Sequence, residues 1–173
     1  MKSDTLAVFD FTNDADAAIW DSVDDVVMGG VSRSAFRLVG GGIGVFEGVL
    51  SLEHGGGFAS VRSQPAQFDL SAYDGLEIRV RGDGKRYRLR LRTDAYPDGV
   101  AYQVGFETQA DTWQSERFLF QHFRPTFRGR TVPDAPPLDA SHIASFGWMI
   151  ADKQAGAFRL EIDSVRAYVD GVL

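Results

Sequence analysis

Apolar and charged residues alternate along Leu76-Glu-Ile-Arg-Val-Arg-Gly-Asp-Gly-Lys-Arg-Tyr-Arg-Leu-Arg-Leu-Arg92, and this segment decides the fold class. In each half, the apolar residues share one side of the chain and the charged residues share the other. A period of two residues indicates β-strands with one buried and one solvated face. Gly82-Asp-Gly84 between the halves predicts a hairpin turn. The segment therefore predicts two paired strands whose arginines point to solvent.

Short segments of the same kind lie on both sides of this hairpin, separated by glycine and proline turns. We predict further strands at Leu6–Phe11, Ser32–Val39, Ile43–Leu52, Phe58–Gln64, Val100–Thr108, Trp113–Phe120, His122–Phe127, Phe146–Ala151 and Phe158–Val169. Asp139–Ala144 offers at most a short helical turn with Asp139 as its N-cap. About ten short antiparallel strands without a long helix favour a β-sandwich. We expect this all-β sandwich to form one domain over residues 1–173.

The composition excludes several classes of protein and site. The net charge of -6 argues against general affinity for nucleic acid. The chain has no cysteine, which excludes disulfides, thiolate zinc sites and cysteine nucleophiles. The sequence shows neither a secretory h-region nor an apolar run near the ~18 residues of a membrane span. We therefore expect a cytoplasmic protein without a membrane span.

Glycine and histidine motifs give little support to catalysis or metal binding. His54-Gly-Gly-Gly57 is similar to the oxyanion loop of some esterases, but the sequence has no Gly-x-Ser-x-Gly nucleophile elbow. The histidines at positions 54, 122 and 142 lack metal-ligand spacing. Calcium is the alternative left open, with candidate ligands at Asp21, Asp24, Asp25 and the aspartates of residues 94–98. Because Asp-rich loops are usually solvated turns, we predict no metal and no cofactor.

Glu107 and Glu116 are the strongest catalytic candidates. If residues 100–108 pair with residues 113–120, both carboxylates share one sheet face. Glycoside hydrolases use two carboxylates ~5–10 Å apart. Exposed glutamates are common on sheets, however, and Phe118 breaks the alternation. We predict a non-catalytic protein, with a glycoside hydrolase as the less favoured interpretation.

Arginines dominate the solvated face of the predicted hairpin: Arg79, Arg81, Arg86, Arg88, Arg90 and Arg92. Like charges opposed in a sheet destabilise it, so either a partner or carboxylates such as Glu77, Glu107 and Glu116 must offset them. Both interpretations stay open. Arginine outnumbers lysine by 15 to 3, and its planar guanidinium favours bidentate carboxylate contacts and interface hot spots. We predict that these arginines, together with Arg62 and Trp113, bind an acidic protein surface.

Several motifs resemble the complex I intermediate-associated protein family. They are Trp20-Asp-Ser-Val-Asp-Asp-Val-Val-Met-Gly-Gly-Val-Ser32, Phe46-Glu-Gly-Val-Leu-Ser-Leu-Glu-His-Gly-Gly-Gly-Phe-Ala-Ser-Val-Arg62, Trp113, Phe123-Arg-Pro-Thr-Phe-Arg-Gly129 and Gly156-Ala-Phe-Arg-Leu-Glu-Ile-Asp163. Together they span nearly the whole chain. The resemblance implies a galactose-binding-like jelly roll and a bacterial relative of factors that assemble respiratory complex I without known catalysis. It implies protein partners such as complex I subunits or assembly intermediates.

The two longest motifs also contain residues with an expected structural role. Trp20 and Met28 are expected to be core or rim anchors, Phe58 belongs to the same set, and Gly29, Gly30, Gly56 and Gly57 would allow close turns. The polar residues amid these apolar ones are Asp25, Ser32, Ser60 and Arg62. We predict that they form one network that pins loops to the sandwich.

A carbohydrate-binding module is the alternative function. Sandwiches of this class bind sugars on a concave face or on end loops. Exposed aromatic platforms at Tyr96, Tyr102 or Trp113 would favour sugar, whereas exposed arginines favour an acidic protein surface.

Overall fold

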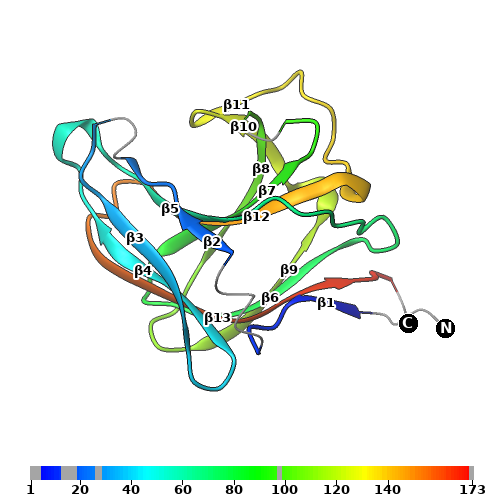
Figure 1. Cartoon of the computed structure of the whole chain (residues 1–173), viewed down its shortest axis with the longest axis horizontal. Helices are drawn as coiled ribbons and strands as arrows, with labels where there is room; N and C mark the ends of the chain where they lie inside the picture. Colours follow the sequence, from blue (N-terminus) through cyan, green and yellow to red (C-terminus); the bar gives the residue numbers. More distant parts are fainter. Residues whose placement is uncertain (1–4, 13–18, 26–28, 97–98, 172–173) are drawn as a thin grey trace.

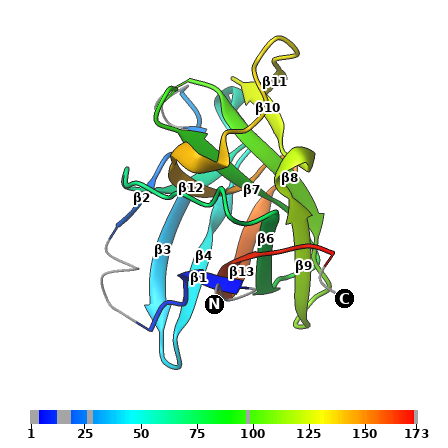
Figure 2. The ribbon, with the colours of Figure 1, turned by 90° about the vertical axis from the view of Figure 1, so that its right-hand side faces the viewer.

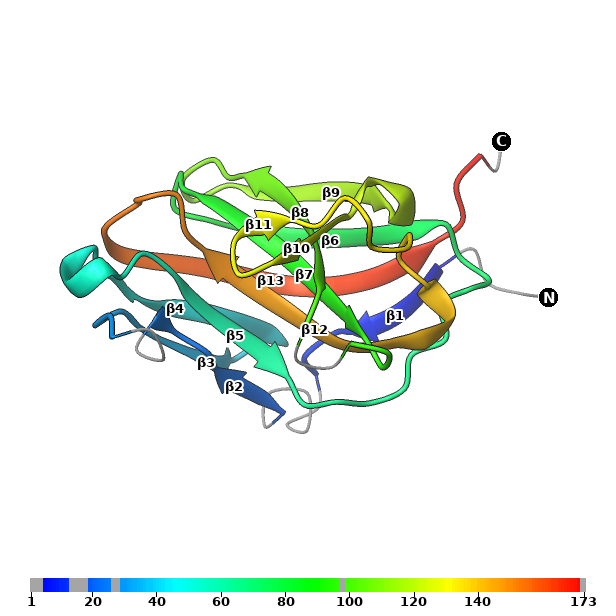
Figure 3. The same cartoon turned by 90° about the horizontal axis from the view of Figure 1, so that it is seen from above.

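The computed structural model describes residues 5–12, 19–25, 29–96 and 99–171, which form two antiparallel sheets packed face to face (Figure 1). Sheet A has the order β3 (Arg33–Val39), β4 (Ile43–Leu50), β13 (Gly156–Tyr168), β6 (Gly75–Arg81) and β9 (Trp113–Leu119), with β1 (Thr5–Phe9) also paired to β13. Sheet B has the order β11 (Arg130–Thr131), β10 (Arg124–Phe127), β8 (Ala101–Glu107), β7 (Arg86–Thr93), β12 (Ile143–Ile150), β5 (Ala59–Ser63) and β2 (Trp20–Ser22). The strands of sheet A lie side by side in Figure 2, and sheet B lies in front of them in Figure 3.

The prediction of an all-β sandwich is confirmed, and the strands fall close to the predicted ranges. The structure adds two short strands that the sequence pattern did not predict, β2 and β11. Three single 3-10 turns complete the described part of the chain: η2 (Glu53–Gly55), η3 (Phe120–His122) and η4 (Ala140–His142). Asp139 caps η4 as expected, because its side chain accepts a hydrogen bond from the Ser141 amide. No helix in the described ranges is long and apolar enough to cross a membrane.

One hydrophobic cluster fills the space between the sheets. The alternating residues of each strand supply it, for example Ile78 from β6, Leu89 from β7 and Trp148 from β12. Each such side chain contributes ~1.5–3 kcal/mol on burial. At one end Phe146 meets Phe9 and Phe68 edge-on, with ring centroids 5.2 and 5.0 Å apart. The burial of alternate residues leaves the other half of each strand on an outer face.

The predicted hairpin between residues 76–81 and 86–92 is wrong. β6 pairs with β13 and β9, whereas β7 pairs with β12 and β8, so the two strands belong to opposite sheets. Arg79 and Arg81 therefore lie on the outer face of sheet A. The outward residues of β7 lie on the outer face of sheet B. The six arginines do not share one face.

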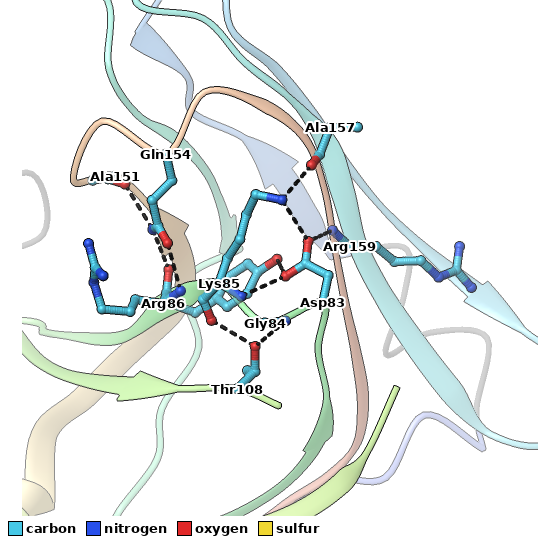
Figure 4. Close-up of polar contacts among 10 residues, drawn as sticks. Asp83, Gly84, Lys85, Arg86, Thr108, Ala151, Gln154, Ala157 and Arg159 are labelled. Carbon is cyan, nitrogen blue, oxygen red and sulfur yellow. Dashed lines mark hydrogen bonds and ion pairs between the residues drawn. The ribbon is translucent and has the colours of Figure 1, made fainter. Parts of the chain in front are cut away.

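The link between β6 and β7 crosses from sheet to sheet through a corner with its own polar partners (Figure 4). The Asp83 carboxylate accepts hydrogen bonds from the Tyr87 hydroxyl at 2.9 Å and from the Arg159 amide at 2.9 Å. Lys85 Nζ donates to the Ala157 carbonyl at 3.0 Å. The Gln154 side chain accepts from the Arg86 amide and donates to its carbonyl, both at 2.8 Å. These bonds take the place of the hairpin ladder that the turn signal predicts.

The assumed pairing of residues 100–108 with residues 113–120 is also wrong. β8 lies in sheet B between β7 and β10, and β9 lies at the edge of sheet A next to β6. Glu107 and Glu116 consequently belong to different sheets and share no sheet face. The Gln114 side chain bridges them by donating to the Glu107 carbonyl at 2.8 Å and to the Glu116 carboxylate at 3.1 Å. The strand pairing that would have placed the two carboxylates on one sheet face is therefore absent.

Candidate binding surface

The outer face of sheet B places two arginines on either side of a glycine. Phe146, Trp148 and Ile150 of β12 enter the core, so the residue between the first two, Gly147, faces outward. In the strand register Gly147 lies opposite Arg62 of β5 on one side and Arg90 of β7 on the other. The row therefore has long cationic side chains at both ends and no side chain in the middle.

These residues line a hollow of about 720 Å³. β5, β7, β8 and β12 provide its floor, and the β10–β11 hairpin, which rises above the other strands in Figure 1, provides one wall. The cationic lining residues are Arg62, Arg88, Arg90, Arg92 and Arg128. Phe58, Phe127 and Met149 supply apolar lining. We call this cavity the basic hollow.

Arg90 lies at the centre of the basic hollow in an unfavourable electrostatic position. Burial and then the charges of Arg92, Arg88 and Arg62 lower the pKa of Arg90 to about 10. Its Nε is buried and donates no hydrogen bond within the described part of the chain. Arg88, in contrast, donates to Asp152 at 2.5 Å. Arg90 is thus a partly buried cation, with a buried Nε, surrounded by like charges.

The tip of the β10–β11 hairpin adds a backbone feature. Phe127 and Arg130 pair across it, and the two residues between them both have positive φ angles, 50° at Arg128 and 78° at Gly129. Two-residue turns with positive φ at both positions favour Asn-Gly or Gly-Gly, and arginine is strained at the first position. The Arg128 guanidinium lies over the Phe127 ring at 5.2 Å. A strained arginine therefore lines the mouth of the basic hollow.

The outer face of sheet A neutralises its arginines with carboxylates. Arg159 bridges Glu47 at 2.8 Å and Glu161 at 3.1 Å, and Glu161 also lies 3.4 Å from Arg81. Arg79 lies 3.7 Å from Asp163. Arg81 and Arg79 thus have partners, supplied by strand β13 rather than by the glutamates that we expected.

The structure separates the predicted binding residues into two groups. Arg62, Arg88, Arg90 and Arg92 line the basic hollow. Trp113 belongs to sheet A, where Arg79 lies 5.3 Å above its ring. Arg86 is exposed at the start of β7, outside the lining of the hollow.

Asp25 organises the loop beside the basic hollow. Its buried carboxylate accepts hydrogen bonds from the Ser32 amide at 2.9 Å, the Ser32 hydroxyl at 2.5 Å, the Gly57 amide at 2.7 Å and the Phe58 amide at 3.2 Å. Burial alone raises the pKa of Asp25, but these hydrogen bonds outweigh it and hold the pKa below its ordinary value. Since Gly57 and Phe58 line the hollow, Asp25 positions part of its wall.

Two of the motif glycines make room for the Asp25 carboxylate. A Cβ on Gly30 would lie 2.3 Å from Asp25 Oδ1, and one on Gly56 would lie 2.6 Å from Asp25 Oδ2. Gly29 has a φ angle of 90°, which favours glycine at that position. Met28 lies outside the described residues.

Ser60 and Trp20 occupy neighbouring positions in this end of the sandwich. The Ser60 amide donates to Asp24 at 3.0 Å, so Ser60 joins the carboxylate next to Asp25. Trp20 is buried and stacks on Phe36 with a centroid distance of 4.7 Å. Arg62, which we grouped with Asp25, instead lines the hollow.

The described residues form no metal cluster, and two of the three candidate sugar platforms differ in exposure. No three His, Asp or Glu side chains among them are placed to hold a metal ion. Tyr102 is buried, with its hydroxyl donating to the Pro136 carbonyl at 2.8 Å, and Tyr96 is 38% exposed.

Sequence reasoning missed Gly147, Phe127, Arg128 and Met149 as residues of the hollow. A glycine between the core residues Phe146 and Trp148 was one available signal, because an isolated glycine in a strand often marks close approach of another group. The Arg128-Gly129 pair within Phe-Arg-Gly-Arg was the second, since it suits a two-residue hairpin.

Comparison with known proteins identifies the family. The family model described as "Complex I intermediate-associated protein 30 (CIA30)" matches residues 9–162. The chain belongs to this family. The Asp25 network and the basic hollow are therefore features of a member of the complex I intermediate-associated protein 30 family.

Curated relatives agree with this assignment. The mitochondrial complex I intermediate-associated protein 30 of Drosophila melanogaster is 27% identical over 184 residues, covering 94% of this chain and 62% of the relative. The mouse protein of that name is 30% identical over 107 residues, covering 60% of this chain and 33% of the relative. An uncharacterised protein of Schizosaccharomyces pombe is 29% identical and covers 84% of this chain and 76% of its own length. The chain therefore spans less than two thirds of the fly and mouse proteins.

Solved structures show the same jelly-roll fold. The family 11 carbohydrate-binding module of Clostridium thermocellum, solved with a mixed-linked tetrasaccharide, has a TM-score of 0.74 and 16% identity over 95% of both chains. An agarase has a TM-score of 0.67 and 14% identity, covering 99% of this chain and 25% of the agarase. At these identities the likeness concerns the fold alone.

Proposed function

We propose that this chain is a non-catalytic binding module that assists assembly of respiratory complex I, and that its basic hollow binds an acidic protein segment. Membership of the complex I intermediate-associated protein 30 family supports the assembly role. The prediction of a cytoplasmic location stays a prediction, because the named fly and mouse relatives are mitochondrial.

The electrostatic environment of Arg90 is the observation that supports the proposed binding site. A partly buried cation whose neighbours are Arg62, Arg88 and Arg92 destabilises the unbound protein. An acidic group in the hollow would offset that repulsion and would receive charge-assisted, bidentate hydrogen bonds. Phe58, Phe127 and Met149 offer apolar contacts beside the charges, as in the core of a protein interface.

The test is affinity capture from host extract by the intact chain and by two matched variants. Arg90→Glu reverses a charge in the hollow, where Arg62, Arg88 and Arg92 would neutralise the new carboxylate and preserve folding. Arg79→Glu makes the same change on sheet A. We expect the intact chain and Arg79→Glu to capture complex I subunits. Arg90→Glu should capture at least ~10-fold less of them, a loss typical of substitutions at charged interface hot spots. Equal capture of complex I subunits by all three proteins, or a loss of capture with Arg79→Glu alone, would contradict the assignment of binding to the outer face of sheet B.

A carbohydrate-binding module is the second candidate, favoured by the fold shared with the Clostridium module. The hollow is large enough for a small ligand, and Phe127 is exposed at its edge. Glycan-array binding that survives Arg90→Glu, without capture of complex I subunits, would replace the protein-binding proposal.

A further inference from the structure

The row across Gly147 has the geometry of a site for one oxyanion. Arg62 and Arg90 occupy the strands on either side of Gly147 and line the same hollow. Adjacent strands lie ~4.7–4.9 Å apart, so the two arginine backbones are roughly 10 Å apart. Guanidinium groups that turned inward across that gap would meet above a residue without a side chain. They can then donate to the same tetrahedral group.

The charge around Arg90 favours a group with more than one negative charge. Each charged residue that shifts Arg90 is another arginine, and burial keeps water from screening the repulsion. A carboxylate brings one negative charge, whereas a phosphate monoester brings about -1.5 to -2 at pH 7 and three acceptor oxygens. The second charge would be matched by Arg128, which lines the same hollow.

Arg128 provides an independent observation at the mouth of the same cavity. Its φ angle of 50° is a conformation in which asparagine or glycine would be less strained. The strained position puts a further arginine in the lining of the hollow that Arg62 and Arg90 also line. Strain of this kind concentrates at ligand clamps.

We propose that the basic hollow is a phosphate-monoester site, with Arg62 and Arg90 holding the phosphate above Gly147 and Arg128 closing over it. The inference rests on the proposed function, because it names a phosphorylated side chain of the partner protein as the group that anchors the acidic segment.

Inorganic phosphate is the probe, and thermal unfolding at constant ionic strength is the measurement. We expect phosphate to raise the melting temperature of the intact chain saturably, by about 2–4 °C. Acetate at equal concentration should have less than half that effect. Arg90→Met, which keeps an apolar stem without the charge, should lose the response. The control Arg81→Met, on sheet A, should keep it. An equal response of Arg90→Met and the intact chain, or equal effects of acetate and phosphate, would overturn the proposal.

A measurement on the intact chain covers the case in which Arg90→Met does not fold. The ³¹P resonance of phosphate should broaden on addition of the protein and sharpen again when excess sulfate displaces it. An unchanged line width would overturn the site.

Competition in the capture experiment separates this inference from the proposed function. Capture that depends on Arg90 but resists millimolar phosphate would overturn the phosphate site and leave protein binding intact. Phosphate binding that needs Arg90, with capture indifferent to Arg90→Glu, would support the site and contradict the proposed function.

Discussion

The outer faces of the two sheets both carry arginines, but they differ in how far carboxylates neutralise the positive charge. On sheet A, Arg159, Arg81 and Arg79 each lie within 4 Å of a carboxylate, and the shared partners come from strands β4 and β13. On sheet B, Arg90 lies in a hollow where the charges acting on it are positive. The first face is a solvated ion-pair network, whereas on the second Arg88 pairs with Asp152 and Arg90 is repelled by the other arginines.

This difference teaches that arginine content alone does not identify a binding surface. Exposed ion pairs contribute little to stability and leave no net charge for a partner. A buried cation without a counter-charge has a cost in the free protein, and such a cost persists where function requires it. The search for a binding face should therefore look for an arginine in the position of Arg90, partly buried and repelled by other arginines, rather than for arginines in general.

The largest expected effect concerns the carboxylate that supports the wall of the hollow. Asp25→Asn should lower the free energy of unfolding by about 2–3 kcal/mol, since hydrogen bonds from Ser32, Gly57 and Phe58 lose their charged acceptor. The matched change on sheet A, Asp163→Asn, should have little effect, because Asp163 is exposed and 3.7 Å from Arg79. Urea unfolding of the two variants measures both effects.

The pH dependence of Asp25 has a defined sign. Its folded pKa lies below the ordinary value, so the folded state binds fewer protons than the unfolded state in the acid range. The stabilisation is complete above the unfolded pKa of ~3.9 and is lost as pH falls through the folded value. Wild type should therefore lose more stability than Asp25→Asn below about pH 4. Parallel acid profiles for the two proteins would contradict this.

The fold was predictable because side-chain alternation reports burial directly. Leu76, Ile78, Val80, Leu89 and Leu91 all face the core, as their period-two pattern predicts. Alternation says nothing about which strand lies beside which. The glycine-rich turn between β6 and β7 fitted a hairpin locally, and long-range contacts such as the Asp83–Arg159 bond decided otherwise.

The candidate site was predictable only in part, because side-chain alternation does not report which strands are neighbours. Arg62 and Arg90 were chosen as binding residues, but their approach across Gly147 depends on a strand order of β5, β12 and β7 that no local pattern encodes. Arg79, predicted to share a face with Arg90, and Trp113, predicted to bind the same partner, lie on the other sheet. The Asp25–Ser32 part of the polar network was anticipated because two polar residues stood amid apolar ones in one motif.

Removal of one charge from each face should change stability in opposite directions. Arg90→Met should raise the melting temperature of the unbound protein, because it removes a partly buried charge repelled by Arg62, Arg88 and Arg92. Arg159→Met should lower it, because it breaks contacts with Glu47 and Glu161. Changes of about 1–3 °C are expected in each direction. Differential scanning calorimetry in phosphate-free buffer measures both melting temperatures. A lower melting temperature for Arg90→Met would contradict the proposed difference between the two faces.

Substitutions in the β10–β11 hairpin test whether the strained backbone at Arg128 is retained because it supports phosphate binding. Arg128→Asn should stabilise the protein by up to about 1 kcal/mol, since asparagine tolerates positive φ better than arginine. The same variant should weaken phosphate binding several-fold because a guanidinium leaves the hollow wall. Arg130→Asn, outside the central turn positions, is the control and should change neither property. Unfolding curves and phosphate titrations of both variants measure the two effects. Stabilisation by Arg128→Asn without weaker phosphate binding would show that Arg128 does not take part in phosphate binding.

The smallest effect is expected at the floor of the hollow. A Cβ on Gly147 would lie 3.2 Å from the Val61 carbonyl and 3.7 Å from Arg90 Cβ, so Gly147→Ala needs only a slight shift of its neighbours. We expect less than about 1 kcal/mol of destabilisation, together with a two- to five-fold loss of phosphate affinity, because a methyl group enters the gap between Arg62 and Arg90. Gly105→Ala on β8 is the control, since its Cβ would meet the Tyr87 carbonyl at an ordinary 3.8 Å and lies outside the lining. Equal phosphate affinity in the two variants would mean that the bare row across Gly147 is a feature of sheet packing and not of the site.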